Sequence, residues 1–503
     1  MLAIISAATL LGAEGRPVSV EVHVSNGLPA FSVVGLPDEA CRESRDRVRA
    51  ALLSSGQVWP AKRITVNLAP SGVRKTGSGL DLAMAVGVLV ASEALEPASV
   101  AALAFLGELG LDGSIRRVPG IVPLVDALGD RVAVVPPGCV GEARLVARGA
   151  VRHATSLAEL VRAARDEVPW PEEDETPATP DEDFGPDLAD VRGHVVGRLA
   201  VEVAAAGGHH LLLIGPPGAG KTMLAQRMPS LLPPLDRATA LSATMIHSAA
   251  GLPLPGGLVR RPPLRMPHHS ASLVAMVGGG TATMRPGEVS IAHGGVLFLD
   301  ELGEFQPAVL DGLRQPLEEG VVRVTRARGS VEFPSRFQLV AAMNPCPCGA
   351  ASKPGACQCG DALRTRYLRR VSGPLLDRFD LRLEVGRPEV DELLGAPEGE
   401  SSAVVAARVD AARRLAAERH GDTNSAIPGH RLDELAPLSK AARALLRREV
   451  ETDRLSGRGL HRVRRVARTL ADLRGGPDEI DEESISTALH LRIDPFDPAR
   501  RAA

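Results

Sequence analysis

The segment 209–222, HHLLLIGPPGAGKT, constrains the fold of this chain more than any other stretch. An apolar run, a glycine-rich turn and a helix start follow one another in the order that a phosphate-binding loop requires. In this pattern backbone N–H groups wrap the phosphates, the lysine reaches the β and γ oxygens, and the threonine ligates Mg²⁺. A purely structural turn would not need the lysine and threonine. We therefore predict an α/β fold that binds ATP and Mg²⁺ through Gly215, Pro216, Pro217, Gly218, Ala219, Gly220, Lys221 and Thr222.

Two further apolar runs end in polar residues that suit nucleotide hydrolysis. GGVLFLDEL ends with Asp300 and Glu301, and FQLVAAMN ends with Asn344. Asp300 is predicted to complete the Mg²⁺ shell, Glu301 to orient and deprotonate the attacking water, and Asn344 to hydrogen-bond that water and the γ-phosphate. Alone, such residues would be ordinary polar strand ends. Together with the phosphate loop they predict an ATP hydrolase.

Two arginines further along the chain are candidates for neutralising charge on the transferred phosphoryl group. Arg378 lies in GPLLDRFDL beside a predicted strand, and Arg462 lies in the helical stretch GLHRVRRVARTLADL. Arginines in such places often act across a subunit boundary. From spacing alone, both remain equally open to a plain ion-pair role.

The charge distribution divides the chain. Residues 166–190 hold eleven acidic residues and no Lys or Arg, and they are rich in proline, so we predict a solvated linker there. The other residues contain 58 basic and 50 acidic side chains, a formal charge of +8.

Basic clusters at 42–49, 323–328, 364–370 and 461–468 are either solvated helix faces or phosphate contacts. An aromatic content of 2% disfavours base stacking, so DNA would be bound mainly through its phosphates.

The first 165 residues alternate strand patterns with helical ones, which predicts a separate α/β domain. The apolar opening MLAIISAATLLGA lacks the basic region of a signal peptide and runs into the alternating pattern VSVEVHV. No charge-free apolar run reaches the roughly 18 residues that a membrane-spanning helix needs. We expect a cytoplasmic protein with no membrane partner and with reduced thiols.

Four of the six cysteines lie in NPCPCGAASKPGACQCG, residues 344–360. Cys346, Cys348, Cys357 and Cys359 form a doubled C-x-C-G pattern, whose thiolates and glycine turns suit a closed structural Zn²⁺ site. The usual spacing is C-x-x-C, so metal-free thiols or a redox disulfide remain open alternatives. Cys41 and Cys139 are expected to be small packing residues.

The ordered motifs resemble the magnesium-chelatase-like branch of the AAA+ ATPases, and over nearly the whole chain the ComM/YifB family. The resemblance rests on NGLPAFSVVGLPDEACRESRDRVRAAL, RITVNLAPSGVRKTGSGLDLAMAVGVL, GPPGAGKT, MPHHSASLVAMVGGG, PGEVSIAHGGVLFLDELGEF, NPCPCG, SGPLLDRFDL and HRVRRVARTLADL. It implies that Asn344 is the sensor 1 residue, Arg378 the finger that acts on a neighbouring subunit, and Arg462 the sensor 2 arginine. Arg458 and Arg465 compete for that last role.

The resemblance also implies the domain layout and the assembly. An N-terminal ribosomal-S5-domain-2-like (Lon-protease-like) domain at 1–165 precedes the linker 166–190, an AAA+ P-loop core at 191–388 with the cysteine-rich insertion 344–360, and a C-terminal helical lid at 389–503. The implied protein is a homo-hexameric helicase that promotes branch migration in homologous recombination and natural transformation. A basic hairpin within 320–337, containing Arg323, Arg326 and Arg328, would project into the central pore and contact DNA phosphates.

Two rival functions stay open. A Lon-like serine protease would need a Ser-Lys pair, but Gly79 takes the nucleophile position beside Ser78 and no lysine follows where the pair requires one. A magnesium-chelatase-like or protein-remodelling ATPase would use the same ATPase core. His268 and His269 are adjacent, so their side chains diverge and a shared metal site is not expected.

Overall fold

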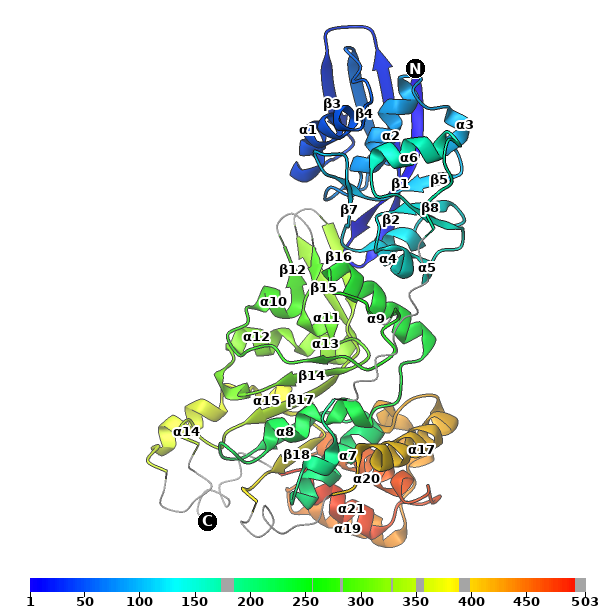
Figure 1. Cartoon of the computed structure of the whole chain (residues 1–503). Coiled ribbons are helices and arrows are strands. Elements are labelled where there is room, and N and C mark those ends of the chain that lie inside the picture. Colours follow the sequence, from blue (N-terminus) through cyan, green and yellow to red (C-terminus); the bar gives the residue numbers. More distant parts are fainter. Residues whose placement is uncertain are drawn as a thin grey trace.

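The computed structural model describes residues 1–172, 185–255, 257–280, 284–326, 329–349, 357–388 and 399–493. Two large sheets organise these residues, one of seven strands near the amino terminus and one of five strands in the middle of the chain. Figure 1 shows an elongated molecule in which the N-terminal domain, the five-stranded sheet and the C-terminal helices follow one another along the long axis. Residues 173–184 of the predicted acidic linker lie outside the described residues.

The seven-stranded sheet has the order β3-β4-β2-β1-β5-β8-β9. The apolar opening of the chain forms β1, which lies inside this sheet between β2 and β5. Helix α2 (Asp81–Ala91) is buried along its whole length against β1 and β2, which explains why its sequence is apolar on every face. The strands are β1 (Leu2–Leu11), β2 (Glu14–Ser25), β3 (Ala30–Val34), β4 (Arg63–Ala69), β5 (Leu103–Phe105), β8 (Val132–Val135) and β9 (Val151–His153).

Helices complete the N-terminal domain, which has the ribosomal-S5-domain-2-like fold. Its helix α1 begins at a side-chain cap, because the Asp38 carboxylate accepts a hydrogen bond from the backbone N–H of Cys41 at 2.9 Å. The helices used below are α1 (Glu39–Ser54), α4 (Ile121–Asp126), α5 (Val140–Arg144) and α6 (Leu157–Ala164).

The five-stranded sheet is parallel, with the order β11-β14-β17-β10-β18. Its central strands are continuous buried runs that are apolar except for Gln338 at the start of β17, as expected for a sheet covered on both faces. In such sheets ligands bind at the carboxyl ends of the strands. The strands are β10 (Leu211–Ile214), β11 (Leu264–Arg265), β14 (Val296–Leu299), β17 (Gln338–Met343) and β18 (Leu381–Glu384).

The C-terminal helices pack onto the five-stranded sheet through helix α7 (Val195–Gly207). They share one apolar cluster with α7, β10 and β18, so the helical region is continuous with the five-stranded sheet and does not stand apart from it. The helices are α17 (Ser402–His420), α19 (Lys440–Glu451), α20 (Gly457–Leu473) and α21 (Glu482–His490).

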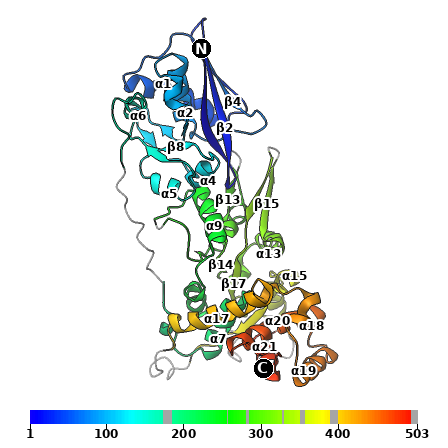
Figure 2. The same ribbon diagram turned by 90° about the vertical axis from the view of Figure 1, so that its right-hand side faces the viewer.

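The N-terminal domain contacts the core through the turn between β1 and β2 (Figure 2). Ala13 in this turn packs in the same apolar cluster as Val331 and Phe333 of the hairpin β15 (Val321–Arg326) and β16 (Gly329–Pro334). A Cβ atom on Gly12 would lie 2.1 Å from Val331 Cγ1, and φ at Gly12 is +66°. Glycine is therefore required at this junction for both space and backbone conformation.

A second contact joins α4 to helix α9 (Arg237–Ala250). The Gly120 N–H donates to the Ser248 carbonyl at 2.9 Å, and the Val122 N–H donates to the Ser248 hydroxyl at 3.2 Å. These bonds, together with the apolar contact at the β1–β2 turn, fix the N-terminal domain on the face of the core that carries the β15–β16 hairpin.

Candidate nucleotide-binding site

The predicted phosphate loop lies between a strand and a helix of the five-stranded sheet region. It leaves β10, turns at Gly218 and Gly220 with φ values of +75° and +76°, and enters α8 (Lys221–Gln226). Residues with a side chain rarely adopt these φ values, so the two glycines permit the turn that presents backbone N–H groups. The loop is tied to β18 because the guanidinium of Arg387 donates to the Pro217 carbonyl at 3.0 and 3.2 Å.

The Lys221 ammonium lies within the loop that it is predicted to serve. Its Nζ donates to the carbonyls of Gly215 at 2.8 Å and Pro216 at 3.0 Å, and to Asn344 Oδ1 at 3.2 Å. Burial lowers the pKa of Lys221, whereas the carboxylates of Asp300 and Glu301 act to raise it. The structure thus brings the predicted phosphate-binding lysine and Asn344 into direct contact.

The two predicted Mg²⁺ ligands also meet. The Thr222 hydroxyl donates to Asp300 Oδ2 at 2.7 Å, across the carboxyl ends of β10 and β14. A hydroxyl and a carboxylate at this distance form an oxygen donor set of the kind that Mg²⁺ prefers beside nucleotide phosphates. These residues fit the ion, and it would supply charge neutralisation on the β and γ phosphate oxygens.

Glu301 follows Asp300 in a strained conformation, with φ at +52° although it is not glycine. Its carboxylate Oε2 lies 3.1 Å from His269 Nδ1. His269 belongs to the segment between β11 and α10 (Leu273–Val277), and its ring lies against that of His268, with centroids 4.0 Å apart. The prediction that these two side chains diverge is therefore wrong, because the segment is neither helix nor strand. Sequence reasoning assigned no role to His269, because nothing in the spacing to Glu301 indicates the contact.

A cavity of about 700 Å³ opens at this edge of the sheet, and its lining includes Lys221, Thr222, Asp300, Glu301 and Asn344. Residues that motif reasoning did not single out also line it: Asp190, Arg192, His194, Arg387 and Pro388. Arg387 and Pro388 could have been found from their position shortly after the parallel strand β18. No signal in the sequence pointed to His194, which adopts a left-handed conformation before α7.

Arg378 and Arg462 lie together, away from this cavity. Arg378 precedes Asp380 by two residues, just before β18 begins, and Arg462 pairs with Asp380. The nucleotide groups, in contrast, follow the carboxyl ends of the strands. Because β18 has four residues, the amino and carboxyl edges of the sheet lie roughly 13 Å apart. Arg378 pairs with Glu318, and Arg462 pairs with Asp380 and donates to the Arg378 carbonyl at 3.1 Å.

The surroundings of Asp380 explain this arrangement. Although burial acts to raise the pKa of Asp380, the contact with His209 and the positive charge of Arg462 hold that pKa well below its ordinary value. Burial and the neighbouring charges of Arg462 and Arg458 lower the pKa of Arg378. Of the competing arginines, Arg458 is 84% exposed, and Arg465 donates to the Ile427 carbonyl at 2.8 Å.

Several arginines of two basic clusters form ion pairs within the chain. In α20, Arg464 pairs with Asp433 and Arg468 with Asp472, both at 2.8 Å, so the stretch 461–468 serves mainly as a scaffold for the helical region. In the hairpin, Arg323 forms ion pairs with Glu319 and Glu332. These carboxylates offset the positive charge of Arg323, and its contact with DNA phosphates stays a prediction. The side chain of Arg326 and the whole of Arg328 lie outside the described residues.

The four clustered cysteines converge. Sγ of Cys346 lies 3.3 Å from that of Cys348 and 3.6 Å from that of Cys357, and the four Sγ atoms lie within 4.8 Å of one another. These separations exceed the roughly 2 Å of a disulfide and match the roughly 3.8 Å edge of a tetrahedron of sulfurs around Zn²⁺. The backbone N–H of Cys359 lowers the pKa of Cys357 to about 6, which favours a ligating thiolate. The cluster is compatible with a metal; residues 350–356 lie outside the described residues.

The position that a Lon-like nucleophile would need holds Gly79. The neighbouring Ser78 donates its hydroxyl proton to Glu108, and no lysine or histidine is hydrogen-bonded to Ser78 among the described residues. Its partner is a carboxylate and not the lysine of a Ser-Lys pair. Among all the residues that the structure describes, no helix is long and apolar enough to cross a membrane.

Comparisons with known proteins agree with this architecture. Profiles described as magnesium chelatase, subunit ChlI, match residues 187–393, 20–137 and, for its C-terminal part, 399–492. An uncharacterized protein of Mycobacterium tuberculosis is 46% identical, with 96% of each chain covered. YifB of Escherichia coli, also uncharacterized, is 41% identical over 98% of this chain and 96% of its own.

Two further relatives bear on function and fold. Competence protein ComM of Haemophilus influenzae is 39% identical over 98% of this chain and 97% of its own. A shorter match, 30% identical over 159 residues, is to Lon protease 2 of Bacillus subtilis. The nearly complete coverage by ComM and YifB, together with the chelatase profiles, shows that the chain belongs to the ComM/YifB family of magnesium-chelatase-like AAA+ ATPases.

Proposed function

We propose that the protein is a Mg²⁺-dependent ATP hydrolase that works as a hexameric motor on DNA. The observation that carries the hydrolase part is the contact between Thr222 and Asp300 at 2.7 Å, beside Glu301, at the carboxyl edge of the parallel sheet. This arrangement joins a metal-ligating pair, a general base and a phosphate loop in one cavity.

Each group has a separate task in the proposed reaction. The loop N–H groups and Lys221 hold the β and γ phosphates, and Thr222 and Asp300 hold Mg²⁺, which spreads the negative charge of the transferred group. Glu301 accepts a proton from the attacking water, while Asn344 hydrogen-bonds that water and the γ-phosphate. Lys221 must exchange its loop carbonyl contacts for phosphate oxygens when ATP binds.

Arg378 is proposed to act on the ATP of a neighbouring subunit. It lies at the amino ends of the strands, so it is remote from the cavity of its own chain, and its guanidinium is one-third exposed. Its partner Glu318 would release it when the neighbour's phosphate approaches. Arg462 is proposed as the sensor 2 residue on the same face, because it pairs with Asp380 next to the Arg378 backbone.

A mixing experiment tests this assignment. Glu301→Gln and Arg378→Ala should each bind ATP but lose turnover, by at least about a hundredfold. If Arg378 acts in trans, equal mixtures of the two proteins should regain activity at about a quarter of the interfaces, where an intact pocket meets an intact arginine. Arg447→Ala, on the exposed face of α19, is the matched control and should keep its turnover. A mixture as inactive as its components would contradict action in trans.

The DNA role is supported by the relative described as a competence protein and by the family resemblance. We propose branch migration in homologous recombination and natural transformation, with binding mainly through phosphates. Arg366 and Arg369 on α14 (Asp361–Leu368) and just after it are exposed and form no ion pair among the described residues, which makes them phosphate-contact candidates. Stimulation of ATP turnover by DNA tests this proposal. Absence of stimulation would favour the alternative, a chelatase-like or protein-remodelling ATPase.

We further propose that Cys346, Cys348, Cys357 and Cys359 bind one structural Zn²⁺ ion. The supporting observation is the convergence of the four Sγ atoms directly after Asn344. Such a site would hold the inserted loop beside the ATPase core, and the Cβ that Gly349 lacks would lie only 2.6 Å from Pro217 Cδ of the phosphate loop. The protein is expected to carry about one zinc per chain by elemental analysis.

A further inference from the structure

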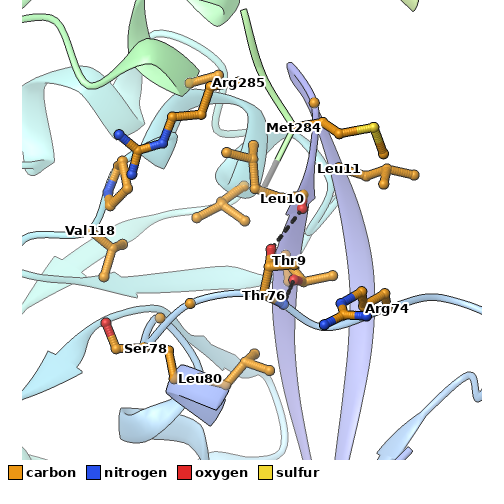
Figure 3. Close-up of a pocket in the computed structure, with 18 of the residues that line it drawn as sticks. Thr9, Leu10, Leu11, Arg74, Thr76, Ser78, Leu80, Val118, Met284 and Arg285 are labelled. Carbon is orange, nitrogen blue, oxygen red and sulfur yellow. Dashed lines mark hydrogen bonds between the residues drawn. The ribbon is translucent and has the colours of Figure 1, made fainter. Parts of the chain in front are cut away.

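A second cavity, of about 320 Å³, lies where the N-terminal domain meets the ATPase core (Figure 3). Leu10, Leu80 and Val118 line it from the N-terminal domain, and Met284 and Arg285 line it from the core. It shares no lining residue with the nucleotide cavity. Its volume falls at the lower end of the range of small-molecule sites.

The charge of the lining is uncompensated. Arg74 and Arg285 are its ionisable side chains, and no Asp or Glu lines it among the described residues. Neither guanidinium forms a hydrogen bond or an ion pair among those residues. Arg285 is exposed, whereas the Nε of Arg74 is buried without a hydrogen-bond partner. A buried donor without a partner costs roughly 1–3 kcal/mol, so an anion that accepts from Arg74 would remove a penalty.

The other polar groups of the lining are already engaged. The Thr76 hydroxyl donates to the Leu10 carbonyl at 3.1 Å, drawn as the dashed line in Figure 3, and the Ser78 hydroxyl donates to Glu108. Figure 3 shows the two arginines on opposite sides of the cavity, with the aliphatic side chains between them. No aromatic side chain lines the described cavity, so nothing there favours a stacked ring over an aliphatic chain.

From these features we infer that the cavity is a binding site for a small anion with an aliphatic body, a carboxylate or a phosphate monoester. The head group would accept hydrogen bonds from Arg74 or Arg285, and the aliphatic body would lie against Leu10, Leu80 and Met284. Because the walls come from two domains, such a ligand would stabilise their contact. The inference does not rest on the proposed function.

The test is isothermal titration calorimetry of the full chain with octanoate and octyl phosphate, compared with octan-1-ol and acetate. Octan-1-ol lacks the charge, and acetate lacks the aliphatic body. The variants are Arg74→Gln, Arg285→Gln and Gly79→Leu, with the exposed Arg49→Gln on α1 as the matched control. Leucine at 79 fills the cavity without backbone strain, because a Cβ there has ordinary contacts of 3.7 Å to Val118 and φ is not positive.

We expect octanoate or octyl phosphate to bind at least tenfold more tightly than octan-1-ol and acetate, and the tighter of the two identifies the head group. The variant of the arginine that holds the head group, Arg74→Gln or Arg285→Gln, should weaken that binding about tenfold, Gly79→Leu should abolish it, and Arg49→Gln should not change it. Equal binding of octan-1-ol, or arginine variants that bind like Arg49→Gln, would overturn the inference. If a variant does not fold, the comparison of ligands on the unmodified protein still decides.

Discussion

Glu301 lies in the left-handed region, with φ at +52°, and this strain should be measurable. A residue with a Cβ pays about 1–2 kcal/mol there, and glycine avoids that cost but loses about 0.5–1 kcal/mol more backbone entropy than alanine on folding. We therefore predict that Glu301→Gly is about 0.5–1 kcal/mol more stable than Glu301→Ala. Both variants remove the carboxylate and its contact with His269, so the comparison isolates the backbone.

Urea denaturation followed by circular dichroism gives the free energies of unfolding, and ATP turnover is measured on the same samples. Both variants should lose turnover by about 10²–10⁴-fold, because the general base is gone. The control is Ala411→Gly on the exposed face of α17, where glycine should cost about 1 kcal/mol relative to alanine. If glycine is as unfavourable at 301 as at 411, the backbone of Glu301 is not strained and the reasoning is refuted.

Three further predictions concern neighbouring groups. His269→Asn should lower ATP turnover about 3–30-fold without changing ATP binding, because the contact at 3.1 Å positions Glu301. The matched variant His268→Asn should keep its turnover. Equal effects of the two substitutions would contradict a positioning role for His269. His293 accepts the Arg336 N–H at 3.1 Å, and burial lowers its pKa from 6.5 to about 4. The folded protein therefore favours neutral His293. As the pH falls from 6.5 towards 4, the free energy of unfolding should decrease by up to about 3 kcal/mol. In His293→Asn the free energy of unfolding should depend less on pH over this range. Cys346→Ser should release the zinc and lower the unfolding midpoint, whereas Cys139→Ser should leave the zinc in place.

The phosphate-site residues could be predicted because their geometry follows from strand ends. Asp300 and Asn344 each come directly after a buried apolar run, and the carboxyl ends of parallel strands meet at one edge, where Lys221 and Thr222 also lie. In the structure Lys221 is hydrogen-bonded to Asn344, and Thr222 is hydrogen-bonded to Asp300. A local sequence pattern was sufficient to predict these contacts, because the carboxyl ends of parallel strands lie at the same edge of the sheet.

Long-range pairing could not be predicted in the same way. His269 reaches Glu301 from a segment that bears no periodic relation to it, and Arg323 is neutralised by carboxylates on its own hairpin and on the preceding helix. The register of α20 decides which arginines face Asp380 and which face Asp433, and a cluster of arginines leaves that register open. The cavity between the domains depends on how two separate folds dock, which no motif records.

Whether the protein is an ATP-driven DNA motor is decided by its ATP turnover with no DNA, single-stranded DNA, linear duplex and a four-way junction, with Glu301→Gln as the background. The account predicts turnover that depends on Mg²⁺, is absent in Glu301→Gln, and is stimulated most by the junction, with stimulation that weakens steeply as salt increases. Turnover that no DNA stimulates would contradict a DNA motor, and turnover retained in Glu301→Gln would contradict the catalytic site.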